Sequence, residues 1–386
     1  MSIEKNSKHV MKPYHKLADS NVSNDLHNSL TNVRIHGERD IKPMVLLLPL
    51  KIRTAYGINN ISANGAGQTI AIIDAYAYPT ETIQSNLNTF CAQFGIPTTT
   101  IVSKIMTNSA GNLPTANSDW GLEISLDIQW AHAIAPGATI LMIQAYSASF
   151  TDMMAAVDYA INNNATIVSM SWGSNEFRLQ TIYDSRFKKL NNKGDNIVHL
   201  ASSGDVGGIV SWPSSSNNII AVGGTTLNVD INGNRTSETG WNGSGGGISL
   251  VESMQSFQRN YGITGNKRQV PDVSFVADPN TGVPVYDNGT WYQVGGTSLS
   301  APCYAGIIAI ANQIRSNSRK TLLTTNSVLT YMYGTKKSGK YTSDFFDVIS
   351  GTAGRHTAKI NYDNVTGLGS PKIAVSTGII IDLAKL

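Results

Sequence analysis

Residues 295–302 read Gly-Gly-Thr-Ser-Leu-Ser-Ala-Pro, and a long apolar run follows from Cys303. The run predicts a buried helix, and Pro302 suits its first turn, where a missing N–H group costs nothing. Ser298 would then lie at a helix N-terminus, where free N–H groups and the helix dipole favour a developing negative charge. The stretch is therefore a candidate nucleophile motif. The alternative is an ordinary serine cap after a glycine turn, and the stretch alone does not separate the two.

The composition is that of a globular protein with a substantial core. The chain has 386 residues, of which 41% are hydrophobic and 14% charged, and its net charge is +3. So small a charge does not indicate nucleic acid or a membrane as partner, and no stretch approaches the roughly 20 apolar residues of a membrane span. Two cysteines are too few for a disulfide scaffold or a four-cysteine zinc site. We expect a monomer.

The first 45 residues differ from the rest in composition. They are polar, lack an export signal, and hold four histidines without helical or strand period, namely His9, His15, His27 and His36. We expect residues 1–45 to be a flexible or loosely attached tail. The alternative, a metal-binding histidine cluster, is disfavoured by the irregular spacing. Residues 46–386 show neither a repeat nor a linker and are expected to form one domain.

Strand and helix patterns alternate after residue 68. The run Thr69–Ile73 is a buried strand that ends at Asp74, and residues 44–50 read as an extended segment that docks on the core. Further strands are expected at 98–104, 138–143, 166–171, 196–201 and 218–224, and helices at 80–94, 120–133, 150–162 and 178–191. This alternation predicts an α/β fold with three layers and a mostly parallel central sheet.

Polar residues follow several of these strands, at the edge where the ligands of open α/β sheets bind. They are Asp74, the stretch Ser171-Trp172-Gly173, and Asp205 after Ser203-Gly204. With Ser298, the order resembles a subtilisin-like fold, yet the histidine motif that such a protease needs after Asp74 is missing. Outside the first 45 residues only His132, His199 and His356 remain, and a structural role is expected for each.

Two carboxyls occupy one face of the predicted 120–133 helix instead. Glu123 and Asp127 are four residues apart, so they are neighbours, and their segment is otherwise nearly free of charge. Like-charged neighbours of this spacing usually lie on a solvated face. In an apolar segment they are better explained as a pair that shares a proton and has raised pKa values.

Four motifs in one order now point to a family. They are Glu123-x-x-x-Asp127 followed by Ala-His-Ala-Ile-Ala-Pro-Gly-Ala at 131–138, Ala-Ser-Ser-Gly-Asp at 201–205, Gly-Thr-Ser-Leu-Ser-Ala-Pro at 296–302, and Asp347-Val348 with Asp-Asn-Val-Thr-Gly-Leu-Gly-Ser-Pro at 363–371. From about residue 46 to its end, the chain resembles the sedolisins, or serine-carboxyl peptidases, which have a subtilisin-like fold and a Ser-Glu-Asp triad.

The resemblance implies an acid-acting endopeptidase that cleaves peptides or unfolded proteins. Ser298 would be the nucleophile, Glu123 its base, Asp127 the partner of Glu123, and Asp205 an oxyanion donor that must be protonated to donate. Substrate backbone would pair with two exposed edges, Ser171-Trp172-Gly173 and Gly245-Gly246-Gly247. Relatives of this kind are secreted or work in acidic compartments, whereas the sequence itself assigns no location.

A structural calcium ion is also implied by the resemblance. Asp347 and Asp363 would give carboxylates, and Val348, Lys359 and Asn361 backbone carbonyls. Two other interpretations of the chain stay open: a catalytically silent peptide-binding module on the same fold, and a histidine-dependent subtilisin that uses Asp74.

Overall fold

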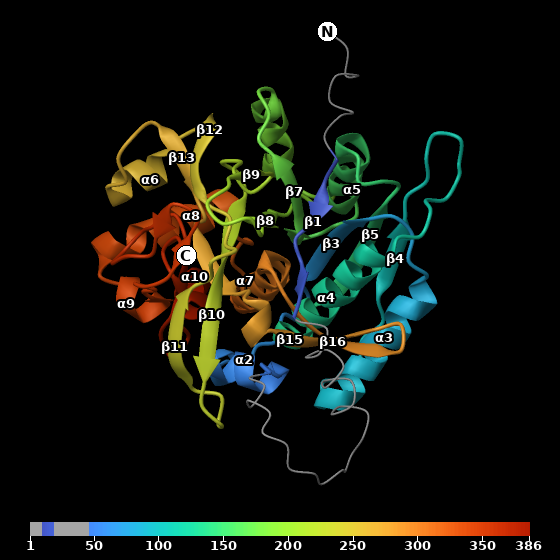
Figure 1. Ribbon diagram of the computed structural model, residues 1–386, viewed down its shortest axis with the longest axis horizontal. Coiled ribbons are helices and arrows are strands. Elements are labelled where there is room, and N and C mark those ends of the chain that lie inside the picture. Colours follow the sequence, from blue (N-terminus) through green and yellow to red (C-terminus); the bar gives the residue numbers. More distant parts are fainter. Residues whose placement is uncertain (1–9, 19–45) are drawn as a thin grey trace.

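The computed structural model describes residues 10–18 and 46–386 and places an eight-stranded sheet at the centre (Figure 1). The strand order is β11-β10-β8-β6-β3-β5-β4, with β14 also paired to β10. Only β10 and β11 run antiparallel, so the predicted mostly parallel sheet is confirmed. The strands are β3 (Thr69–Ala75), β4 (Val102–Ile105), β5 (Thr139–Ala145), β6 (Ile167–Met170), β8 (Val198–Ser202), β10 (Ile220–Val229), β11 (Arg235–Gly240) and β14 (Val273–Val276).

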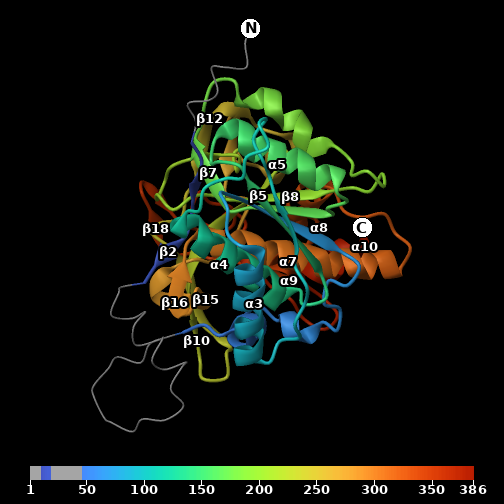
Figure 2. The ribbon, with the colours of Figure 1, turned by 90° about the vertical axis from the view of Figure 1, so that its right-hand side faces the viewer.

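Helices cover both faces of this sheet, which gives the predicted three layers. Helices α3 (Thr80–Phe94), α4 (Ser118–Ile134) and α7 (Thr297–Asn317) lie on one side, and α5 (Phe150–Asn162) lies on the other (Figure 2). Alternate residues of β3 follow this division, because side chains alternate across a strand. Ile70 and Ile72 belong to the apolar cluster that contains α4 and α7, whereas Ala71 and Ile73 belong to the cluster that contains α5.

The other elements are short or peripheral. The helices are α2 (Pro49–Ala55), α6 (Ser256–Tyr261), α8 (Thr325–Ser338), α9 (Tyr341–Asp344) and α10 (Ile379–Lys385), with 3-10 turns at Ile58–Asn60, Gln180–Lys188 and Pro279–Thr281. The strands are β1 (Lys12–Pro13), β2 (Lys16–Leu17), β7 (Trp172–Asn175), β9 (Ser211–Trp212), β12 (Gly247–Ser253), β13 (Lys267–Val270), β15 (Val283–Asp287), β16 (Thr290–Gly295), β17 (Phe345–Phe346), β18 (Thr352–Ala353), β19 (His356–Thr357) and β20 (Ser370–Pro371).

Most predicted elements are present, and three differ. The strand expected at 98–104 is β4, which begins only at Val102. Residues 178–191 form 3-10 turns at Gln180–Lys188 rather than an α-helix, and these turns bury only Gln180 and Phe187. With so little apolar surface to bury, packing does not favour a regular helix there. Of residues 44–50, the structure describes 46–50, and the last two are helical because α2 begins at Pro49, where proline is well tolerated at a first turn. Among the described helices, none has both the length and the apolar character of a membrane span.

Residues 10–18 are docked on the domain, which differs from the prediction of a loosely attached tail. Met11 is buried, and β1 and β2 pair with β7 and β16. Figure 1 shows the blue strand β1 beside β7. These contacts join residues far apart in the sequence, so the local pattern carried no sign of them. Residues 1–9 and 19–45 lie outside the described residues, and so do His9, His27 and His36.

Candidate active site

Three carboxylates meet beneath the carboxyl end of the sheet. Asp74 lies on β3 at the same face as Ile70 and Ile72, and α4 packs on that face with Glu123 and Asp127 one turn apart. An oxygen of each carboxylate lies within 4.8 Å of an oxygen of each of the others. All three side chains are fully buried. The sheet and one helix thus bring together acids that are 53 residues or less apart in sequence but separated by a whole β–α unit.

Burial favours the protonated forms of Asp74 and Asp127 in this cluster. It raises the pKa of Asp74 well above its ordinary value, and the charge of Glu123 raises it further. Burial likewise raises the pKa of Asp127, with added repulsion from Asp74 and Glu123, and the Ser171 hydroxyl offsets only part of this rise. Among the described residues, no group donates a hydrogen bond to Asp74. A buried carboxyl without such a donor is stable only in its neutral form.

Ser298 lies in the first turn of α7, the helix that packs on α4, and is fully buried. Its hydroxyl donates a hydrogen bond to the carbonyl oxygen of Ser171 at 3.1 Å. Its backbone N–H donates to the carbonyl oxygen of Tyr14 at 2.9 Å. The sequence suggested that the N–H groups at this helix start could bind an anion. In the structure, the N–H of Ser298 binds a peptide carbonyl.

Asp205 also lies near that carbonyl, because both adjoin Gly296. Its Oδ1 accepts hydrogen bonds from the backbone N–H and the hydroxyl of Thr297, both at 2.8 Å, while Oδ2 has no partner among the described residues. Gly296 explains how the two acceptor oxygens fit, because a Cβ there would be 2.6 Å from Asp205 Oδ2 and 2.3 Å from the Tyr14 oxygen. Burial raises the pKa of Asp205 to about 7, so that below this pH Oδ2 can carry a proton toward the carbonyl.

One predicted substrate edge, Ser171-Trp172-Gly173, is already paired with another segment of the same chain. Residues Lys12–Pro13 pair antiparallel with Trp172–Gly173, and Tyr14 N–H donates to the Ser171 carbonyl at 3.1 Å. The other predicted edge bonds to other parts of the domain: Gly245 N–H donates to Gly204, Gly246 N–H to Ile209, and Gly247 pairs with Val270. Its role in substrate binding stays a prediction.

The histidines separate into two groups. His132 and His199 are buried and bond to none of the three carboxylates: His132 bonds the Pro97 carbonyl at 2.7 Å, and burial lowers the pKa of His199 to about 3. His15 is the residue that the sequence interpretation missed, because it was assigned to the tail. Its Nδ1 lies 2.5 Å from Glu123 Oε2. No local signal could have identified it, since the contact spans 108 residues.

The predicted calcium ligands also come together. Asn361 N–H donates to Asp347 Oδ2 at 3.0 Å, and Lys359 N–H donates to Asp363 Oδ2 at 3.2 Å. Val348 is fully buried, yet no described group donates a hydrogen bond to its carbonyl oxygen. Buried carbonyls are nearly always paired, so this one fits a cation ligand, and an all-oxygen set fits Ca²⁺.

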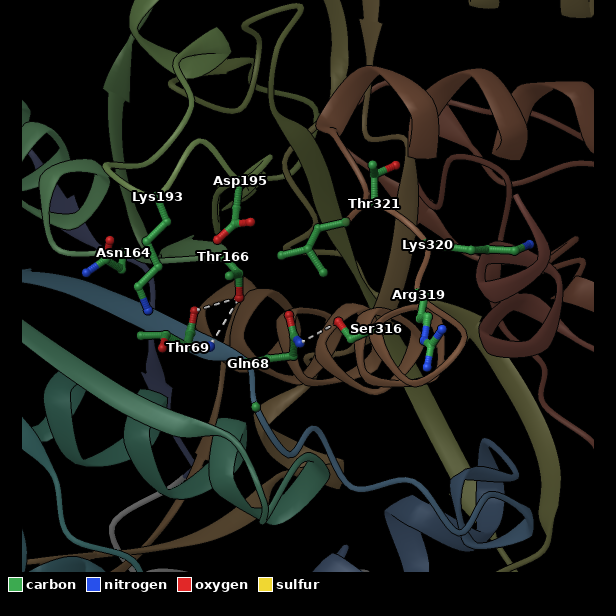
Figure 3. A pocket seen from close by; sticks show the side chains of 12 residues that line it. Gln68, Thr69, Asn164, Thr166, Lys193, Asp195, Ser316, Arg319, Lys320 and Thr321 are labelled. Atoms are coloured by element: carbon green, nitrogen blue, oxygen red, sulfur yellow. Dashed lines mark hydrogen bonds between the residues drawn. The ribbon is translucent and has the colours of Figure 1, made fainter.

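The cavity in Figure 3 is separate from the carboxylate cluster. It has a volume of about 450 Å³ and is lined by Gln68 and Thr69 at the start of β3, together with Ser316 and Lys193. Because Asp74 lies near the other end of β3, the cavity is at the amino ends of the strands, opposite the carboxylates. None of the predicted catalytic residues lines it, and we do not assign it the chemistry.

Comparison with known proteins agrees with the geometry. A model of the subtilase family matches residues 97–352, more than half of the chain. Kumamolisin of Bacillus sp. (strain MN-32) is 32% identical over 293 residues, which are 69% of this chain and 52% of that protein. Tripeptidyl-peptidase 1 of Dictyostelium discoideum is 28% identical over 374 residues, 84% of this chain and 57% of that protein. The chain thus spans about half the length of these relatives.

The structure has a solved neighbour as well. Pseudomonas sedolisin, a serine-carboxyl proteinase solved in complex with two molecules of pseudo-iodotyrostatin, superposes with a TM-score of 0.72 at 27% sequence identity. The match covers 84% of this chain and 94% of that one. The chain therefore belongs to the subtilase family and, within it, to the sedolisins.

Proposed function

We propose that this protein is a serine-carboxyl endopeptidase that hydrolyses peptide bonds of peptides or unfolded proteins at acidic pH. The observation that carries the proposal is the position of the Tyr14 carbonyl, which accepts the N–H of Ser298 and lies, like the unpartnered Oδ2 of Asp205, against Gly296. A peptide carbonyl in that position has a serine hydroxyl and two oxyanion donors around it, which is the arrangement that acyl transfer requires.

In the proposed mechanism, the Ser298 hydroxyl attacks the substrate carbonyl and gives its proton to Glu123. Asp127 and Asp74 adjoin Glu123 and are held neutral by burial, so each can donate a hydrogen bond to Glu123 while Glu123 is ionised and accept one after Glu123 has taken the serine proton. Glu123 then protonates the leaving amine, and water hydrolyses the ester that is left on Ser298. The carboxyl cluster takes the place that an imidazole has in other serine peptidases.

Acidic conditions are required because of Asp205. Its raised pKa of about 7 keeps it neutral, and able to donate, below that pH. As the pH rises through 7 the carboxyl ionises, becomes an acceptor only, and repels the oxyanion. We therefore expect kcat to fall toward neutral pH.

The two rival interpretations are less well supported. A silent binding module has no need of buried carboxyls with raised pKa values beside a serine. A histidine-dependent subtilisin needs a histidine on the fold next to Asp74, and within the described residues His15 is the histidine that contacts the cluster, from a docked segment. We further propose that Asp347, Val348, Lys359, Asn361 and Asp363 hold one structural Ca²⁺ that takes no part in the reaction.

The test compares Glu123→Gln and Ser298→Ala with the unchanged protein, using a denatured protein substrate at pH 4. A general base contributes about 10²–10⁴ in rate, so Glu123→Gln should lose at least 100-fold in kcat and Ser298→Ala essentially all activity. Glu81→Gln, an exposed acid in α3, is the control and should keep full activity. Full activity in Glu123→Gln would sink the mechanism, and an alkaline optimum would favour the subtilisin interpretation.

A further inference from the structure

The cavity at the amino ends of the strands has the size of a site for a small molecule. Its volume of about 450 Å³ lies near the lower end of the range for small-molecule pockets, roughly 300–1,000 Å³, which suits an amino acid or a dipeptide. Strand β3 begins at Thr69 beside the cavity and carries Asp74 near its other end. Helix α7 likewise has Ser316 in the cavity wall and Ser298 in its first turn. A ligand in the cavity would therefore not displace substrate from the carboxylate site.

Gln68 gives this cavity a buried acceptor without a partner. The residue is only 2% exposed, its Nε2 donates to Ser316 Oγ at 3.4 Å, and its Oε1 accepts no hydrogen bond from the described residues. Figure 3 shows that oxygen turned away from Ser316, toward the side on which Asp195 and Thr321 lie. Because buried amide oxygens are nearly always paired, a ligand that brings an N–H or ammonium donor fits this place.

Asp195 adds a negative charge to the same lining. Its Oδ2 accepts a long hydrogen bond of 3.4 Å from Asn191 Nδ2, and Asp195 takes part in none of the ion pairs among the described residues. The ammonium group of a ligand would thus find a carboxylate in Asp195 and a buried acceptor in Gln68.

Two cations of the lining are free to bind carboxylates. In the part of the chain that the structure describes, the side chains of Lys193 and Arg319 form no hydrogen bond or ion pair. Lys320, by contrast, donates to the carbonyl oxygen of Lys385. Figure 3 shows Lys193 and Arg319 on opposite sides of Gln68, with Lys320 directed away. The cavity therefore offers two separate positions for a carboxylate.

The backbone of Arg319 supports a role for its side chain. Helix α7 ends with hydrogen bonds from the Arg319 N–H to Ser316 and from the Lys320 N–H to Arg315, and Arg319 has a φ of +57°. Glycine is the usual residue at such a helix end, because it adopts a positive φ without steric cost. Stability alone would favour glycine here, so the arginine indicates that the guanidinium has a function at the cavity.

We propose that this cavity binds a small acidic amino compound, an amino acid or a dipeptide that carries two carboxylates and one ammonium group. Lys193 and Arg319 hold the carboxylates, and Asp195 and Gln68 Oε1 hold the ammonium. The two free cations exceed the single acid by one charge, and such a ligand has the complementary charge of −1. An inorganic anion would leave the charge of Asp195 unpaired. The site is independent of the peptidase function proposed above.

Isothermal titration calorimetry on the full chain with Ser298→Ala, at pH 6, tests the ligand class. The probes are the dipeptide Ala-Glu, the dipeptide Ala-Gln, which lacks one carboxylate, and N-acetyl-Ala-Glu, which lacks the ammonium group. We expect a Kd of about 1 mM or less for Ala-Glu. The other two should bind about 10-fold more weakly or worse, since a charge-assisted contact is usually worth at least about tenfold in affinity.

Variants in the same background test the residues. Lys193→Gln and Arg319→Gln should each weaken the binding of Ala-Glu about 10-fold, and both change exposed side chains, so Tm should stay the same. Arg178→Gln is the matched control, because Arg178 is an exposed cation that does not line the cavity, and it should leave the Kd unchanged. Gln68→Met and Asp195→Asn should each reduce the preference for Ala-Glu over its acetylated form.

Three results would overturn this ligand site. They are no binding of Ala-Glu, the same Kd in Lys193→Gln as in Arg178→Gln, and equal affinity for inorganic phosphate and Ala-Glu. Because the protein in these titrations lacks the Ser298 hydroxyl, each result holds whether or not the peptidase proposal is correct.

Discussion

At the scale of single residues, Asp205 gains its chemistry from its surroundings. An aspartate is normally an acceptor, and here Oδ1 accepts twice from Thr297 while burial keeps a proton available for Oδ2. The two oxygens thus have different tasks: Oδ1 fixes the side chain, and Oδ2 lies, like the Tyr14 carbonyl oxygen, against Gly296. This division predicts how an amide would behave in the same place.

Asp205→Asn should keep part of the activity, because its amide oxygen can accept from Thr297 while its nitrogen donates toward the oxyanion at any pH. Asp205→Ala should lose about 10²–10³ in kcat, the usual cost of one oxyanion donor. On the proposed mechanism, the unchanged protein should lose activity as the pH rises through about 7, where Asp205 ionises. The asparagine variant should therefore lose less of its own activity between pH 5 and pH 7. Profiles of kcat against pH test this, and equal defects in the two variants would contradict the donor role.

The sequence identified some of these residues and missed others for a physical reason. Glu123, Asp127 and Ser298 could be found because each stands out locally: paired acids in an apolar helix, and a serine at a helix start. The involvement of Asp74 in the carboxyl cluster depends on sheet register, and that of His15 on a contact 108 residues away. The sequence could mark Asp74 only as a strand-end carboxyl, and the contacts of Asp74 and His15 with the carboxyl cluster become visible only in three dimensions.

At the scale of elements, the buried helices and strands were the most predictable. The bounds of α3 and α5 agree with the sequence prediction, because each has an apolar face and a clear start, such as the Ser149 cap of α5. Helix α4 extends the predicted range by two residues at its start and one at its end, and every residue from Trp120 to Ile134 is buried. The 3-10 turns at Gln180–Lys188 and the docked β1 and β2 were not predicted, because they depend on contacts with other elements rather than on their own periodicity.

The loop between Asp347 and Asp363 gives a prediction at the same scale. If a Ca²⁺ ion holds these two carboxylates and the Val348 carbonyl together, a chelator should lower Tm by several degrees, since a bound ion stabilises the folded state only. Asp363→Asn should have a lower Tm from the outset and show little further change with chelator. Differential scanning calorimetry with and without EDTA, then with Ca²⁺ restored, measures both. A Tm in the unchanged protein that ignores chelator would remove the calcium proposal and leave the peptidase proposal intact.

At the scale of the whole molecule, the buried acids couple catalysis to stability. Burial raises the pKa of Asp74 and Asp127 well above the ordinary range, that of Asp205 to about 7, and that of Glu252 to about 8. A carboxyl with a raised pKa binds its proton more tightly in the folded protein than in the unfolded chain. Its favourable contribution to the free energy of unfolding is fully present below the pKa that the carboxyl has in the unfolded chain. That contribution is lost as the pH rises through the pKa that the carboxyl has in the folded protein. Buried His199 has a pKa of about 3, so it lowers the stability of the folded protein below about pH 6.5, where the histidine of the unfolded chain is protonated.

Because the raised carboxyls outnumber the buried neutral histidines, we expect the protein to be more stable in acid than at weakly alkaline pH. Each unit of raised pKa corresponds to about 1.4 kcal/mol, so ionising several buried acids should lower Tm by roughly 5 °C or more between pH 5 and pH 8. The Ser298→Ala variant is the protein to measure, since it does not digest itself. Asp205→Asn in the same background should reduce the slope, because it removes one of the ionisations. If Tm instead rises toward pH 8, these acids are charged and paired in the folded state. The protonated carboxyls that the mechanism needs would then be absent.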